Sequence, residues 1–267
     1  MRRSLIPTIA VIALLVLAGC TGAPPTGENE TRAPPDVSPD EFPDAAEINP
    51  SVFEQHATVM GNTSFTLAIQ QNRTDRNPDV MDSNFTYYNR TTTTLFDTND
   101  SQFLQHTPGG EVYSNGAQKY RHSEVNNWTK NQSPTFSTSV FNTSGERYLW
   151  EGLLAANEPV MSTIAINATY ERNGAEWFNG TAVMRYEATG VDALPERVRE
   201  SGMYANFSAT LLLDEDGVIR RYHYTFQKSS VDHSQSRLRA ERSYTITDIG
   251  TTDVEKPDWV TEFQESE

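Results

Sequence analysis

Alternation between apolar and polar residues is the feature that most constrains the fold of this chain. In SFTLAIQ, the residues Phe65, Leu67 and Ile69 face one way, and polar residues such as Thr66 face the other. A period of two is typical of β-strands that bury one face. The same alternation recurs in segments 84–97, 102–107, 111–123, 162–172, 180–190, 204–229 and 237–250. The pattern predicts a mainly β domain.

Short Asn-Gly and Asp-Gly pairs separate several of these segments. They lie at Asn115-Gly116, Asn173-Gly174 and Asp216-Gly217. Such pairs accept the positive φ angles of tight hairpin turns, and a hairpin joins antiparallel strands. The predicted sheet is therefore antiparallel, and its last strands form a meander.

Two or three helices accompany the strands. The apolar spacing predicts helices over 49–60, 144–156 and 193–201. Thr143 and Glu146 fit a capping box at the start of the second helix. Helices with antiparallel strands indicate an α+β, mainly β fold.

The first residues, MRRSLIPTIAVIALLVLAGC, have the layout of an export signal. Arg2 and Arg3 precede an apolar run from Leu5 to Ala18. That run is shorter than the about 20 residues that a spanning helix needs. A charged start, a short apolar core and small residues at its end predict a signal peptide over residues 1–19. The arginine pair also resembles a twin-arginine export signal.

The end of this signal resembles the lipobox of prokaryotic lipoproteins. Leu17, Ala18 and Gly19 lead directly to Cys20, which is the only cysteine of the chain. The resemblance implies cleavage before Cys20 and a lipid on its thiol, so the protein would sit on the extracellular face of the cell membrane. An ordinary signal peptide with an incidental cysteine is the alternative. Residues 20–48, rich in Pro, Gly, Thr and acid, are predicted to form a disordered tether.

The chain is strongly acidic, with 21 Lys and Arg against 36 Asp and Glu and a net charge of −15. Such a surface repels nucleic acid and anionic headgroups at low salt, so polyanion binding is disfavoured and no nucleic-acid partner is expected. An acidic composition this poor in lysine resembles proteins of salt-loving archaea, for which concentrated salt screens the self-repulsion. A merely acidic exported protein is the alternative.

Asn-x-Ser/Thr sequences recur throughout the chain and are N-glycosylation acceptors on exported proteins. A composition biased toward Asn and Thr would produce some of them without any modification. The candidate glycosylation sites are Asn62, Asn72, Asn84, Asn89, Asn99, Asn127, Asn142, Asn167, Asn179 and Asn206.

Motifs for catalysis or cofactor binding are missing from the sequence. The 5 histidines include no closely spaced pair of the kind that binds zinc on a helix. No nucleophile elbow, phosphate-binding loop or dinucleotide fingerprint occurs. The run from Asp214 to Gly217 fits a hairpin turn better than a calcium loop. We therefore expect no enzyme, metal or cofactor, although a glycan- or envelope-acting enzyme stays as a third hypothesis.

The body of the chain, residues 49–263, resembles haloarchaeal surface lipoproteins of undefined role, whose architecture is similar to the LolA/LppX group of lipoprotein carriers. The resemblance lies in the strand, Asp-Gly turn and strand of Leu211–Tyr222, in Ile246–Gly250 and in Pro257–Trp259. It implies a strongly curved antiparallel half-barrel, covered by two or three helices around an apolar cavity. An acidic tail, residues 264–267, follows.

Apolar residues on the alternating strands supply candidates for the lining of such a cavity. They are Phe65, Leu67, Ile69, Met184, Tyr186, Leu211 and Leu213. The alternative is that they pack against one another as an ordinary core. The leading hypothesis is a non-enzymatic lipoprotein, anchored through Cys20, that binds or carries a lipid-like ligand. The second hypothesis is a glycosylated structural or partner-binding surface module with a filled core.

Overall fold

The structure is a computed structural model that describes residues 33–48, 52–75, 86–126, 128–132, 165–228 and 238–266. The chain divides into a unit of residues 1–32 and a unit of residues 33–267. The predicted signal peptide, Cys20 and the first part of the tether therefore lie outside the described residues. Everything below concerns the second unit.

Most described residues belong to one antiparallel sheet. Its strands are β1 (Ser64–Asp75), β2 (Thr86–Asp97), β3 (Gln102–Thr107), β4 (Gly110–Ser114), β5 (Lys119–Ser123), β6 (Trp128–Gln132), β7 (Glu171–Phe178), β8 (Thr181–Thr189), β9 (Tyr204–Leu213), β10 (Ile219–Lys228) and β11 (Arg239–Thr247). The helices are α1 (Phe53–Met60), α4 (Glu196–Glu200) and α5 (Asp258–Ser266). Short 3-10 turns are η1 (Pro39–Glu41), η2 (Ala45–Glu47) and η5 (Val191–Ala193).

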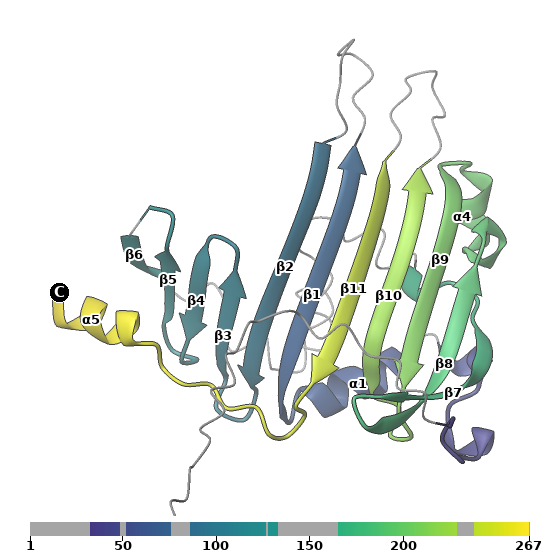
Figure 1. The fold of residues 1–267 in the computed structure, drawn as a ribbon, viewed down its shortest axis with the longest axis horizontal. Helices are drawn as coiled ribbons and strands as arrows, with labels where there is room; N and C mark the ends of the chain where they lie inside the picture. Colours follow the sequence, from purple (N-terminus) through teal and green to yellow (C-terminus); the bar gives the residue numbers. More distant parts are fainter. Residues whose placement is uncertain are drawn as a thin grey trace, which may run out of the picture. The chain divides into compact units, whose positions relative to one another are not determined.

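The 11 strands lie in the order β6-β5-β4-β3-β2-β1-β11-β10-β9-β8-β7 (Figure 1). The first six strands form one meander and the last five form another. Antiparallel pairing of β1 with β11, which matches Leu67 with Ile246, joins the two meanders. The result is a curled open sheet of the half-barrel kind, and the predicted mainly β, α+β fold is confirmed.

Two of the predicted hairpin turns are confirmed. Asn115 and Gly116 connect β4 to β5, with Gly116 at a φ of 81°. The Asn115 side chain accepts a hydrogen bond from the Gln118 N–H at 2.8 Å, as an Asx turn does. The run from Asp214 to Gly217 connects β9 to β10, so it is the hairpin turn that its sequence indicates.

The prediction for the segment before β8 is wrong. The expected strand over 162–172 is replaced by a helical turn at residues 165–166, and β7 starts only at Glu171. The turn lies at Asn179-Gly180 instead of Asn173-Gly174. Asn173 and Gly174 fall at an irregularity in the β7–β8 register, which resumes with Ala175 opposite Met184. Because a bulge and a turn both favour Asn-Gly, the dipeptide alone does not separate them.

The helices agree with the sequence only in part. The predicted helix over 49–60 is present as α1, and the one over 193–201 as α4. The predicted helix over 144–156 lies outside the described residues. Helix α5 was not predicted, and it occupies residues 264–266 of the expected acidic tail.

The sheet buries opposite faces in its two halves. From β8 through β1, the buried face carries Met184, Leu211, Tyr222 and Leu67 and belongs to one large apolar cluster. At β4 and β5, the buried residues Tyr113 and Tyr120 point to the other face. We call the first the inner face and the second the outer face.

Candidate functional site

All seven predicted cavity residues lie on the inner face and belong to one apolar cluster. Met184 pairs with Leu213 and Tyr186 with Leu211 across β8 and β9, while Phe65, Leu67 and Ile69 alternate along β1. Their side chains are buried, at 0–8% exposure. The structure thus brings these residues together, and whether they line a cavity stays a prediction.

The sequence analysis missed the aromatic residues of β10 and β11, which lie between the predicted residues of β8–β9 and those of β1. Tyr222 of β10 pairs with Leu211 on one side and with Tyr244 on the other, and Tyr244 pairs with Ile69. The rings of Tyr222 and Tyr244 are stacked with centroids 6.0 Å apart, and the Tyr222 and Tyr224 rings are 5.4 Å apart. The alternation in RRYHYTF could have indicated Tyr222 and Tyr224, and the alternation in SYTIT could have indicated Tyr244.

Two buried phenol groups stand out on this face. Tyr222 is 2% exposed and Tyr244 is 5% exposed. The Tyr222 hydroxyl interacts with the neighbouring hydroxyl of Tyr170, whereas the Tyr244 hydroxyl has no hydrogen-bond partner among the described residues. Burial, together with the neighbouring Tyr170 and Tyr224, raises the pKa of Tyr222 well above its ordinary value, so the phenol is neutral. A neutral hydroxyl both donates and accepts, and an unpartnered one is costly when buried. The inner face therefore holds two buried hydroxyl groups within an otherwise apolar cluster.

Helix α1 covers part of the inner face. Its Phe53 ring meets Tyr222 edge-on at 6.3 Å, and Met60 is fully buried. His56, 1% exposed, accepts a hydrogen bond at Nδ1 from the Ile219 N–H at 3.1 Å. Burial, helped by the charge of Arg220, lowers the pKa of His56 to about 3, so the ring is neutral and structural.

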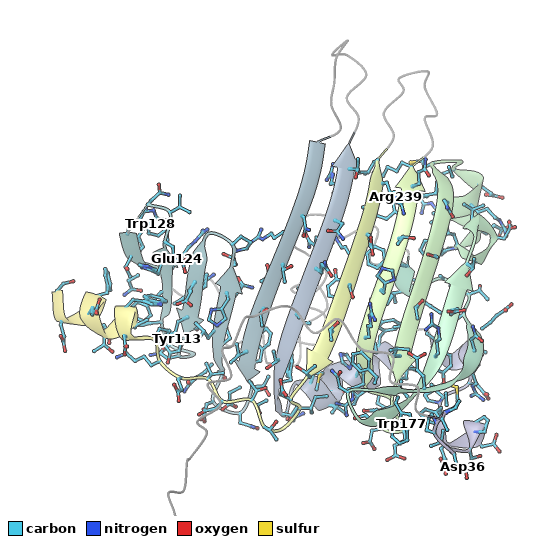
Figure 2. The ribbon with its side chains drawn as sticks, in the orientation of Figure 1. Asp36, Tyr113, Glu124, Trp128, Trp177 and Arg239 are labelled. Carbon is cyan, nitrogen blue, oxygen red and sulfur yellow. The ribbon has the colours of Figure 1, made fainter. Side chains whose placement is uncertain are left out.

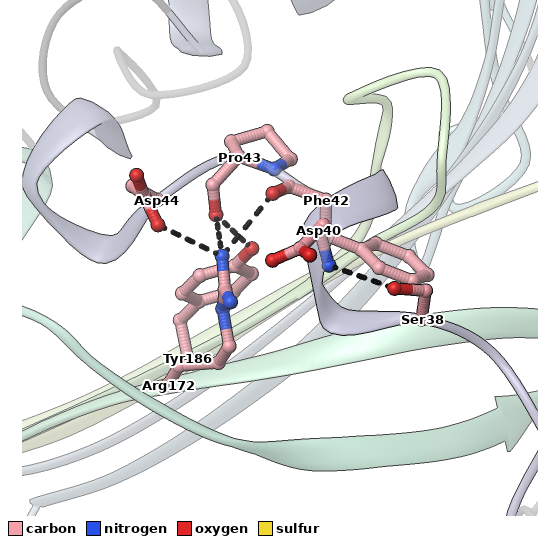
Figure 3. A network of polar contacts seen from close by, with 7 residues as sticks. All are labelled: Ser38, Asp40, Phe42, Pro43, Asp44, Arg172 and Tyr186. Atoms are coloured by element: carbon pink, nitrogen blue, oxygen red, sulfur yellow. Dashed lines mark hydrogen bonds and ion pairs between the residues drawn. The ribbon is translucent and has the colours of Figure 1, made fainter.

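Residues 33–48 are tied to the β7–β8 edge of the inner face. Arg172 Nη2 donates to the carbonyl oxygens of Phe42 at 3.1 Å and Pro43 at 2.8 Å, and it pairs with Asp44 at 3.3 Å. The Tyr186 hydroxyl donates to the same Pro43 carbonyl at 2.5 Å (Figure 3). The disordered tether was predicted to reach residue 48, but the folded unit begins at Ala33. Main-chain carbonyls accept three of these four contacts, and composition does not reveal them.

The outer face has its own apolar cluster beneath α5. Tyr113 and Tyr120 pack there with Val260, which is fully buried. Trp259 Nε1 donates to Glu111 Oε2 at 2.6 Å, and Gln264 donates to the Tyr120 hydroxyl at 2.7 Å. Because this cluster lies on the opposite face, it is a separate core that fixes the C-terminal helix.

Other polar groups of the described residues brace turns or line a small hollow. Within the described ranges, no three His, Cys, Asp or Glu side chains are grouped as a metal would require. Asp214 and Arg220 form a 2.7 Å ion pair, and Asp214 also accepts a hydrogen bond from the Val218 N–H, which braces the turn.

A polar hollow of about 140 Å³ at the ends of β9–β11 is lined by Asn206, Thr225, Phe226, Gln227 and Arg239. No helix among the described residues has the length and apolarity to cross a bilayer.

The candidate glycosylation sites divide by exposure. The exposed ones are Asn62, Asn89, Asn99, Asn167, Asn179 and Asn206. Asn72 is partly buried, and its Oδ1 is buried without a partner among the described residues. Asn84, Asn127 and Asn142 lie outside the described residues. Exposure leaves room for a glycan, and modification stays a prediction.

Comparison with known proteins places the chain in a family. The model of a family of unknown function, DUF7537, matches residues 5–263. The chain belongs to DUF7537. None of the curated proteins matches this DUF7537 chain.

Several solved structures match it as well. LprF from Mycobacterium bovis is 10% identical, with 78% of this chain and 95% of that chain covered and a TM-score of 0.37. The Mycobacterium tuberculosis lipoprotein LppX is 11% identical, with 77% and 98% covered and a TM-score of 0.32. A putative outer membrane lipoprotein-sorting protein domain from Vibrio parahaemolyticus is 10% identical, with 82% and 99% covered and a TM-score of 0.25. At these identities and TM-scores, function has to be inferred from the chain's own residues.

Proposed function

We propose that the inner face binds a lipid-like apolar ligand and that the chain is a non-enzymatic binder or carrier. The observation that carries this proposal is the pair of buried hydroxyls of Tyr222 and Tyr244 within an otherwise apolar face, of which the Tyr244 hydroxyl has no partner among the described residues. Ligand sites are typically apolar with a few polar groups that orient the ligand. A carbonyl or hydroxyl oxygen on a long apolar molecule would satisfy both phenols.

The proposal includes the anchor. The lipobox-like Leu17–Cys20 supports a lipid on Cys20, and residues 21–32 would link that lipid to the folded unit on the extracellular face. Intact mass spectrometry of the protein from its own membranes tests this point. We expect a chain that starts at Cys20 and carries a lipid, with any glycans as further increments. An unmodified chain that still starts at Met1 would contradict the anchor.

Paired tyrosine variants test the ligand site. In a Cys20→Ser protein, we expect uptake of a fluorescent fatty-acid ester. Tyr222→Phe with Tyr244→Phe should weaken binding about tenfold, because roughly one to two hydrogen bonds are lost. Tyr113→Phe makes the same change on the outer face and should leave binding unaltered. Equal affinities in all three proteins would contradict a role for the inner-face phenols.

A partner-binding module with a filled core is the second candidate function. Its supporting observation is the direct packing of α1 on the sheet, with Phe53 and Met60 buried at 5% and 0% exposure. For such a module, no ester would be taken up at all. The tyrosine variants would then change only the free energy of unfolding.

A further inference from the structure

The inner face changes from apolar to cationic across the sheet. One row of residues crosses seven strands from β11 to β6, and each residue of the row is paired with the next by the strand register. The row is Ile246, Leu67, Thr94, Gln105, Val112, Arg121 and Lys130. It begins in the apolar cluster, passes the buried Thr94, and ends on two cations. The apolar and the cationic regions therefore lie on the same face of the sheet.

Cations surround a tryptophan at this end of the sheet. Lys130 Nζ lies 4.8 Å from the centre of the Trp128 ring, and the Arg121 guanidinium lies 5.9 Å from it (Figure 2 labels Trp128). Lys119 lies two residues before Arg121 on β5 and therefore faces the same side of the sheet. Its partial burial and the nearby Arg121 lower the pKa of Lys119. We call Lys119, Arg121, Trp128 and Lys130 the cationic patch.

This patch is unusual for so acidic a chain. The net charge is −15, and the lysines are Lys119, Lys130, Lys228 and Lys256, of which the first two lie in the patch. Across the described part of the chain, neither Arg121 nor Lys130 is paired with a carboxylate. Like charges placed together repel each other, so an anion is the partner that they favour.

We propose that the bound ligand is an anionic lipid whose phosphate-bearing headgroup lies on the cationic patch. This inference rests on the proposed function, because the lipid's chains would lie on the apolar part of the inner face. At about 4.8 Å per strand, Leu67 and Arg121 are roughly 19 Å apart. One leaflet of a bilayer has a hydrocarbon depth of about 15 Å, so a single lipid fits that span. Trp128 suits the boundary between apolar chains and a polar headgroup.

Matched lipids and matched variants test the proposal in the Cys20→Ser protein. We compare a fluorescent phosphatidylglycerol with a diacylglycerol that carries the same chains, at low salt. We expect the phosphatidylglycerol to bind about tenfold more tightly, and Arg121→Gln with Lys130→Gln to abolish that preference. Raising the salt to 1 M should also reduce it. Arg221→Gln with Arg239→Gln removes the same charge from the outer face and should leave the preference intact.

Other outcomes would overturn the proposal in distinguishable ways. Equal binding of the two lipids by every variant would remove the headgroup site and leave the apolar ligand site standing. Binding of neither lipid would overturn the proposed function as well. Tight binding of glycerol phosphate without chains would assign the patch to a free phosphate compound instead of a lipid. A preference lost equally in both double variants would reflect net charge alone.

Discussion

The buried ring of His56 couples the free energy of unfolding to pH. Its pKa is about 3 in the folded chain, against an ordinary value of 6.5. Between those two pH values the unfolded chain binds a proton that the folded chain does not. Stability is therefore complete above about pH 6.5 and falls as the pH drops toward 3. At pH 5 the loss is on the order of 2 kcal/mol.

A substitution of His56 isolates this effect. In His56→Asn, the side-chain oxygen can still accept the hydrogen bond from the Ile219 N–H, but nothing titrates. We expect the difference in unfolding free energy between pH 7 and pH 5 to shrink by about 2 kcal/mol relative to the wild type. Urea unfolding at the two pH values measures it. A pH difference that matches the wild type would contradict the assignment.

The candidate site could be predicted from the sequence only in part. Alternation along single strands was enough to find Phe65, Leu67 and Ile69, because one face of a strand is either buried or exposed. The burial of the Tyr222 and Tyr244 hydroxyls, and the lack of a partner for that of Tyr244, depend on what lies near them in space. Sequence spacing carries no such information, so these groups needed the structure.

At the scale of elements, residues 33–48 act as a strap on the β7–β8 edge. Arg172 donates to two main-chain carbonyls of that strap and is only partly exposed. We expect Arg172→Met to lower the unfolding free energy by about 1.5–3 kcal/mol. It should also speed proteolytic cleavage within residues 33–48.

A neighbouring arginine provides the control for this change. Arg185 of β8 pairs with Glu176 and Glu187 at a more exposed position. Arg185→Met should cost less than about 1 kcal/mol and leave the cleavage rate unaltered. If the two variants were equally stable and equally resistant, the strap would contribute nothing measurable.

Helix α5 makes a second prediction at this scale. Val260 is fully buried beneath it, between the helix and the outer face. Val260→Ala should lower the unfolding free energy by about 1–3 kcal/mol, whereas the exposed Glu262→Ala should change it by less than about 0.5 kcal/mol. Chemical denaturation compares the two, and equal stabilities would show that α5 does not pack as described.

The missed elements share a physical cause. Strand alternation is a local property, so the strands and most hairpins were predictable from sequence. The strap and α5 are held by contacts with strands far away in the chain, such as Trp259 with Glu111. The positions of the strap and α5 also depend on which face of the sheet is buried in each half. That property cannot be read from any single segment of the sequence.

For the whole molecule, the net charge of −15 predicts a dependence on salt. Self-repulsion destabilises a compact acidic chain, and at about 1 M salt it is screened beyond roughly 3 Å. We expect the melting temperature to rise steadily from low to molar salt. Calorimetry measures it, and a melting temperature that stays constant over this range would contradict the salt-adapted interpretation.

Native mass spectrometry of the protein extracted from its own membranes tests the central claim most directly. If the inner face binds a lipid-like ligand, the folded protein should carry a non-covalent mass that organic solvent releases. The covalent lipid on Cys20 would remain attached through the same treatment, so the two are separable. A folded protein with no releasable mass, which also takes up no added lipid, would contradict the proposed function.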